Sequence, residues 1–193
     1  MEFIGPELPL FPISSANSDT CLEKFFTTND EIVDQETARV SIERMQSSLA
    51  EELDYIDKNN PEVNTFINLT QNDIGKLIGE QGSTLLMLGM FALHHAARQQ
   101  DGHPNQNMKT VTPDSLDQYW ADINITRYGD QLVPISQGPN PIEEMYREFT
   151  QQESFLNSKI DEINAETRHK TAIKLGMAIM RDFLQFSHTN NQT

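Results

Sequence analysis

The sequence predicts an α+β fold that is mostly helical, with a small sheet and a C-terminal helical extension. Three patterns support this class. Several segments repeat apolar residues every three or four positions, as amphipathic helices do. Two short segments alternate apolar and polar residues, as strands do. A glycine-rich segment, with four of the nine glycines, lies between the two alternating segments. At 193 residues the chain is long enough to bury a core.

The same patterns divide the chain into four parts. We expect an extended, proline-containing arm over residues 1–27 and an α+β domain over 28–128. A turn-rich linker follows over 129–140, and a helical extension covers 141–193.

Composition limits the classes of function. The net charge is −15, and residues 1–57 account for −10 of it. Such a field repels phosphate backbones and favours basic partners. The single cysteine excludes an internal disulfide and fits a reducing compartment. The N-terminus lacks the pattern of a secretory signal, and the apolar run Leu85–Leu93 is too short to cross a bilayer. We therefore expect a cytoplasmic protein that is not inserted in a membrane.

The arm over residues 1–27 carries prolines at every third position from Pro6 to Pro12, the period of polyproline II. Its apolar side chains would pack either on the protein's own domain or on a partner. As candidate protein-binding residues we take Phe3, Leu8, Leu10 and Phe11.

A helix is predicted over residues 30–57, after a capping box at Thr28–Glu31. Apolar residues recur at steps of three and four from Ala38 to Ile56, and Asn59–Pro61 should end the helix. The opposite face is acidic and would be solvated. Its candidate protein-binding residues are Glu43, Glu51, Glu52 and Asp54.

Strands are predicted at Val63–Leu69 and Tyr119–Thr126, where apolar residues alternate. Between them lies the glycine-rich segment, for which two interpretations are open. Gly75, Gly79, Gly82 and Gly89 would share one face of a continuous helix over 71–100. Because interior glycine destabilises a helix by about 0.8–1 kcal/mol, we favour two helices with a break near Gly79–Gly82.

The run from Asp73 to Leu85, with Gly75, Leu77, Ile78, Gly79, Gly82 and Thr84 in register, resembles the type II KH domain of bacterial Jag-like proteins. The resemblance covers roughly residues 30–128. It implies a KH-like core in which the Gly-x-x-Gly loop clamps single-stranded RNA. The implied nucleic-acid-binding residues are Gly79, Glu80, Gln81, Gly82, Ser83 and Thr84. Here Glu80 and Gln81 replace the usual basic pair, so the loop lacks the charge that neutralises phosphate.

Helical periodicity returns over residues 141–193, after a capping pattern at Asn140–Glu143. The periodicity lapses over 164–170, which indicates two helices or one bent helix. Lys170, Lys174 and Arg181 share a face and form a basic stripe. This stripe would either contact RNA or neutralise acidic residues of the same molecule.

No catalytic motif is recognisable. His94 and His95 point about 100° apart on a helix, and His103 follows in a loop, so we expect imidazoles near a helix C-terminus rather than a metal site. We predict no enzymatic activity, no cofactor and no metal. The favoured function is an acidic, non-enzymatic adaptor or chaperone that binds protein partners with basic or apolar surfaces. Adaptors of bacterial secretion machines are similar in size and charge. The alternative is a single-stranded RNA-binding KH protein.

Overall fold

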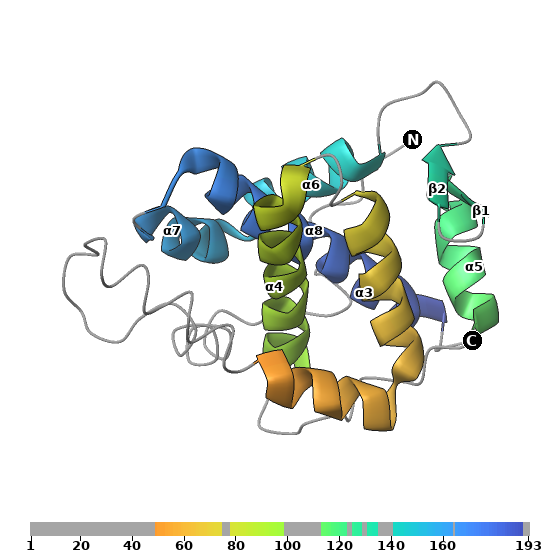
Figure 1. Cartoon of the computed structure of the whole chain (residues 1–193). Helices are drawn as coiled ribbons and strands as arrows, with labels where there is room; N and C mark the ends of the chain where they lie inside the picture. The colour runs from red at the N-terminus through yellow and green to blue at the C-terminus, as the bar shows by residue number, and fades with distance from the viewer. Residues whose placement is uncertain are drawn as a thin grey trace.

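The computed structural model describes residues 49–74, 78–98, 113–122, 125–128, 131–134, 141–163 and 165–190. A helix over residues 49–59 is followed by α3 (Pro61–Asp73), α4 (Gly79–Arg98) and α5 (Pro113–Asp122). Two strands come next, β1 (Ile125–Tyr128) and β2 (Gln131–Pro134). The chain then forms α6 (Pro141–Gln152), α7 (Ser154–Glu162) and α8 (Thr167–Asn190). Figure 1 shows these helices packed around α4 and α8.

The predicted α+β class is wrong, because the described part of the chain is helical apart from one short antiparallel hairpin. In that hairpin Ile125 pairs with Pro134, and Tyr128 pairs with Gln131. The strand predicted at Val63–Leu69 lies inside α3, and the first residues of the strand predicted at Tyr119–Thr126 end α5. The sheet expected of a KH-like core is therefore not found in the described residues.

Helical spacing explains both errors. In α3 the buried residues include Val63, Phe66, Ile67 and Thr70, at steps of three, one and three, which form one helical face. In α5 the buried Leu116, Tyr119 and Trp120 repeat that spacing. Over only seven or eight residues, the alternating apolar positions of a strand coincide with part of this helical pattern. The two periods were therefore not distinguished.

The break before α3 was placed correctly. Pro61 occupies the first turn of α3, where its missing N–H is not needed. The Asn60 amide donates to the Ile56 carbonyl at 2.7 Å, which closes the helix over residues 49–59. In Figure 1 this orange helix lies across the ends of α3 and α4. The predicted helix over 30–57 is thus supported from residue 49 on, and residues 30–48 lie outside the described part.

A helix boundary does fall in the glycine-rich segment, but it comes earlier than the predicted break near Gly79–Gly82. Helix α3 ends at Asp73 and α4 begins at Gly79, so Gly82 lies within the first turn of α4 rather than in a loop. Gly79 has a φ of +80°, a left-handed conformation that glycine adopts readily. A continuous helix over 71–100 is excluded by that conformation.

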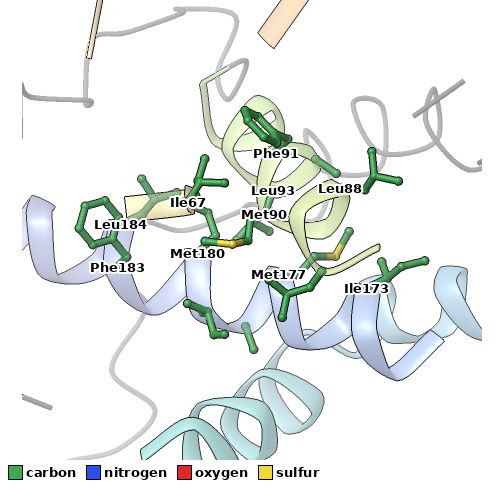
Figure 2. Close-up of a cluster of buried hydrophobic side chains, with 14 of the residues drawn as sticks. Ile67, Leu88, Met90, Phe91, Leu93, Ile173, Met177, Met180, Phe183 and Leu184 are labelled. Atoms are coloured by element: carbon green, nitrogen blue, oxygen red, sulfur yellow. The ribbon is translucent and has the colours of Figure 1, made fainter. Parts of the chain in front are cut away.

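The core is centred where α4 crosses α8, the most extensive contact between two elements in the described residues. Figure 2 shows Met90 and Leu93 of α4 facing Met177 and Met180 of α8. The backbones approach closely because Gly89 lies against the Ile173 carbonyl and Gly176 lies against the Leu86 carbonyl. Each helix thus contributes a glycine at the contact with the other.

An aromatic cluster extends this core toward α3 and α5. The rings of Phe66 and Phe183 stack with centroids 3.9 Å apart. Tyr119 lies edge-on to both rings, and the ring centroids of Trp120 and Phe66 are 5.2 Å apart. The described residues of 141–193 therefore share one core with the helices that precede them.

The described residues of the C-terminal third are helical, as predicted, although they form three helices rather than one or two. Helices α6 and α7 are separated at Glu153, and α8 begins at Thr167, close to the lapse in periodicity. Phe149, Leu156 and Ile160 of the predicted helical extension are buried. No helix in the described ranges has the length and apolarity needed to cross a membrane.

Candidate functional site

A cleft of about 670 Å³ lies between the first turns of α4 and α8. The α4 side consists of residues 78–82. The α8 side consists of Thr167, Arg168, His169, Thr171, Ala172 and Leu175. Most of the surface that lines the cleft is apolar. Its size falls within the usual range of about 300–1,000 Å³ for ligand pockets.

Glycine shapes the α4 side of this cleft. A Cβ atom at Gly82 would lie 3.0 Å from the side chain of Ile78, so that side chain lies directly over the first turn. Ile78 is 39% exposed. The Ser83 hydroxyl donates to the Gln71 carbonyl at 3.5 Å, a long contact that links the start of α4 to α3. On this side, Ile78 therefore forms an apolar lip of the cleft.

The charges at the rim of the cleft are mixed. Arg168 donates to Glu166 at 2.6 Å, and both side chains are exposed. Glu80 on the α4 side is exposed and acidic. The Thr171 hydroxyl donates to the Thr167 carbonyl at 2.9 Å, so it is engaged with its own helix. The arrangement suits an apolar group bound among polar neighbours.

The predicted basic stripe lies close to the cleft, but each of its members has an intramolecular acceptor. Lys170 donates to the main-chain carbonyl of Asp161, and Lys174 donates to the Asp161 carboxylate, both at 2.7 Å. Arg181 is buried, and it donates to Glu153 at 2.8 Å and to Gln152 at 2.6 Å. The stripe thus fastens α8 to the end of α6 and to α7.

The predicted protein-binding residues fall into three groups. Glu51 and Asp54 are exposed, and Asp54 pairs with Lys58 at 2.7 Å. Glu52 was placed on the same solvated face, which is wrong because it is buried. The remaining candidates, Glu43, Phe3, Leu8, Leu10 and Phe11, lie outside the described residues.

Glu52 instead joins two imidazoles of α4. Its Oε1 lies 2.8 Å from His94 Nδ1, and its Oε2 lies 2.7 Å from His95 Nδ1. His94 and His95 lie near the C-terminal end of α4, as expected, and there they also bind this carboxylate. Among the described residues, no three side chains of His, Cys, Asp or Glu are arranged to hold a metal ion. Both rings use Nδ1 to bind the carboxylate.

A second buried polar contact links α5 to α8. The Tyr119 hydroxyl donates to Asp182 Oδ2 at 2.9 Å. Burial raises the pKa of Tyr119 well above its ordinary value, and the negative charge of Asp182 adds to this effect. Burial also raises the pKa of Asp182, the hydrogen bond from Tyr119 lowers it, and the charge of Glu148 raises it. This part-buried pair stabilises the interface between α5 and α8.

Sequence reasoning did not identify the α8 side of the cleft, because Arg168, His169 and Leu175 follow no motif. The burial of Glu52, by contrast, could have been predicted from the sequence. Leu49, Glu52 and Ile56 are spaced by three and four, so Glu52 lies on an inner helical face.

No family model, curated protein or solved structure matches this chain.

Proposed function

We propose that this protein is a non-enzymatic acidic adaptor or chaperone of the cytoplasm, within a bacterial secretion system or another multi-subunit complex. Its cleft between α4 and α8 would bind a segment of a partner protein. That segment would carry an apolar side chain next to lysine or arginine. The cleft is the single observation that carries this proposal.

The composition of the cleft supports protein recognition. Its apolar walls come from Ile78, Ala172 and Leu175. Its lining also includes the polar side chains of Glu80, Arg168 and His169. An apolar centre within a polar rim is the usual arrangement of a protein interface. Ile78 is the natural anchor, since it is exposed although it is apolar.

The charge of the chain supports a basic partner. The net charge of −15 attracts cationic segments and accelerates their association. Near the cleft, Arg168 is matched by Glu166, so this arginine leaves little positive charge to repel a basic segment. Glu51 and Asp54 extend the exposed acidic surface along the helix over residues 49–59.

The contacts of the basic stripe favour a protein partner over RNA. Lys170, Lys174 and Arg181 would have to leave their acceptors on α6 and α7 before binding phosphate. Losing the Arg181 contacts would leave the carboxylate of Glu153 without this partner in a part-buried site, which is unfavourable.

The test compares two charge substitutions that differ in position and little else. Ile78→Glu places a charge in the cleft at a side chain that is 39% exposed, and Leu53→Glu does the same on the helix over 49–59 at 37% exposure. Tagged wild type and both variants are purified from native cells at low salt, with and without RNase. We expect one stoichiometric protein with wild type and with Leu53→Glu, resistant to RNase. Ile78→Glu should lose it, with affinity reduced about tenfold or more.

Two outcomes would overturn the proposal. If Ile78→Glu retains the partner as well as Leu53→Glu does, the cleft is not the binding site. If RNA is recovered instead, or if the protein is released by RNase, the RNA-binding alternative replaces the adaptor. In that case Gln81→Asp should weaken the binding of RNA, because the added carboxylate repels phosphate.

A further inference from the structure

The described residues leave two large apolar side chains exposed, Ile78 at 39% and Leu53 at 37%. Ile78 lines the cleft between α4 and α8, together with the apolar side chains of Ala172 and Leu175. Leu53 lies on the helix over 49–59 and does not line that cleft. Because covering apolar surface is favourable, an apolar segment gains free energy by binding beside Ile78, whether or not a partner is present.

The chain itself contains a segment of that character. Residues 1–13 read Met-Glu-Phe-Ile-Gly-Pro-Glu-Leu-Pro-Leu-Phe-Pro-Ile, and they precede the described part of the chain. With three residues per turn in polyproline II, Leu8 and Phe11 would share one edge of the segment, about 9 Å apart. Leu10 and Ile13 would share another edge. Because proline restricts the unbound chain, such a segment loses less conformational entropy on binding.

The connection to the described part of the chain is long enough for this segment to reach the cleft. The helix over 49–59 contacts the C-terminal end of α4, and the cleft lies at the other end of α4. Helix α4 has 20 residues and spans about 30 Å. Even if residues 30–48 continue the helix and lead about 28 Å away, residues 12–29 extend up to about 60 Å. A tether can give an effective concentration on the order of 1 mM, so even a weak contact is populated.

Charge makes this occupant weaker than the proposed partner. Residues 1–13 contain two glutamates and no lysine or arginine. Glu80 is exposed at the lining of the cleft, where it would repel these glutamates and attract a lysine or arginine of a partner. On the α8 side, Arg168 is already paired with Glu166. The segment therefore matches the apolar walls but not the acidic group, and a partner that matches both can displace it.

We propose that residues 3–11 occupy the cleft between α4 and α8 in the free protein, and that a partner must displace them. The apolar side chains of this segment then cover Ile78 until a partner binds. The contact itself concerns the free protein alone, whereas its inhibitory effect rests on the proposed function of the cleft.

A fluorescent peptide of residues 1–13 tests this contact by titration of full-length chains, with fluorescence anisotropy as the readout. In wild type the chain's own segment fills the cleft, so the peptide should bind weakly. The double variant Leu10→Asp, Phe11→Asp empties the cleft. It should bind the peptide about three- to tenfold more tightly than wild type, for a peptide Kd of about 0.1–0.5 mM and an effective concentration near 1 mM.

The matched pair of charge substitutions locates the peptide. Adding Ile78→Glu to the double variant should weaken peptide binding about tenfold or more, because a charge replaces an apolar wall of the cleft. Adding Leu53→Glu, at nearly the same exposure, should leave peptide binding unchanged.

Photo-crosslinking shows whether the contact forms within one chain. Full-length protein carries benzoylphenylalanine in place of Ile78 or of Leu53, and the crosslinked peptides are identified by mass spectrometry. Position 78 should crosslink to residues 1–13. Position 53 should not, although it is nearer to them along the chain. In a mixture of isotopically labelled and unlabelled protein, both halves of each crosslink should carry the same label.

The docking is refuted if wild type and the double variant bind the peptide equally, or if Ile78→Glu leaves peptide binding unchanged. It is refuted as well if crosslinks from position 78 miss residues 1–13, occur equally from position 53, or join two different chains. No partner is used in these measurements, so their failure is distinct from failure of the proposed function, which the purification with Ile78→Glu and Leu53→Glu tests separately.

Discussion

Replacing Gly176 with alanine should separate the two helices at the centre of the core. The added Cβ would lie well under 3.0 Å from the Leu86 carbonyl oxygen and 3.1 Å from the Met90 amide nitrogen. These are backbone atoms of α4, and no side-chain rotation can move them. Helix α8 would have to shift away from α4, which loosens contacts such as Met177 with Met90.

Two opposing terms set the size of the effect. Alanine in place of glycine stabilises a helix interior by about 0.8–1 kcal/mol. Overpacking a tight core destabilises by about 1–3 kcal/mol, and the upper end applies because the obstruction is backbone. The free energy of unfolding should then fall by about 2 kcal/mol. For a chain of this length that corresponds to a Tm lower by about 4–8 °C.

Thermal unfolding followed by circular dichroism measures this shift, with Gly82→Ala as the matched control. That control adds the same methyl group to α4, but its nearest neighbour at 3.0 Å is the side chain of Ile78, which is partly exposed and can move. Gly82→Ala should change Tm much less than Gly176→Ala. Gly89→Ala should act like Gly176→Ala, and the double variant should lose less than the sum. A Tm that rises in Gly176→Ala would refute the close approach.

The buried polar contacts give further predictions. Tyr119→Phe removes the donor to Asp182 and should lower the free energy of unfolding by about 1 kcal/mol, measured by urea denaturation. The pKa of Asp182 is raised in the folded state, so wild type should lose stability as pH rises through the ordinary range of a carboxyl. Asp182→Asn should remove that loss, and a parallel pH profile for the variant and wild type would contradict it. Arg181→Met breaks the pair with Glu153 and should destabilise by about 2–3 kcal/mol, whereas Lys58→Met, which breaks an exposed pair, should change stability by less than about 0.5 kcal/mol. Equal losses in the last two variants would mean that burial of Arg181 has no energetic importance.

Helical periodicity predicted the fold best where it extended over several turns. The helical character of the described residues in 141–193 and the helix end before Pro61 were both predicted correctly, since they depend on local backbone preferences. The predictions for short segments were wrong. In α3, the pattern from Val63 to Leu69 is too brief to separate period two from period 3.6, and burial against Phe183 decides the outcome.

Contacts between distant segments were beyond prediction from one sequence. Glu52 and His94 are adjacent in space only because the chain turns at Asn60 and α3 leads back to α4. The same holds for the cleft, whose two sides come from residues 78–82 and 167–175. Each side alone looks like the ordinary start of a helix.

The paired glycines also bear on how the chain acquires its structure during synthesis. Gly89 and Gly176 are 87 residues apart, so at ribosomal rates of about 5–20 residues per second α4 exists for on the order of ten seconds before its partner is made. During that interval the apolar side chains from Leu85 to Leu93 lack the surface that covers them in the folded protein. Nascent chains should therefore be most prone to aggregation, and most in need of chaperones, between the emergence of α4 and that of α8.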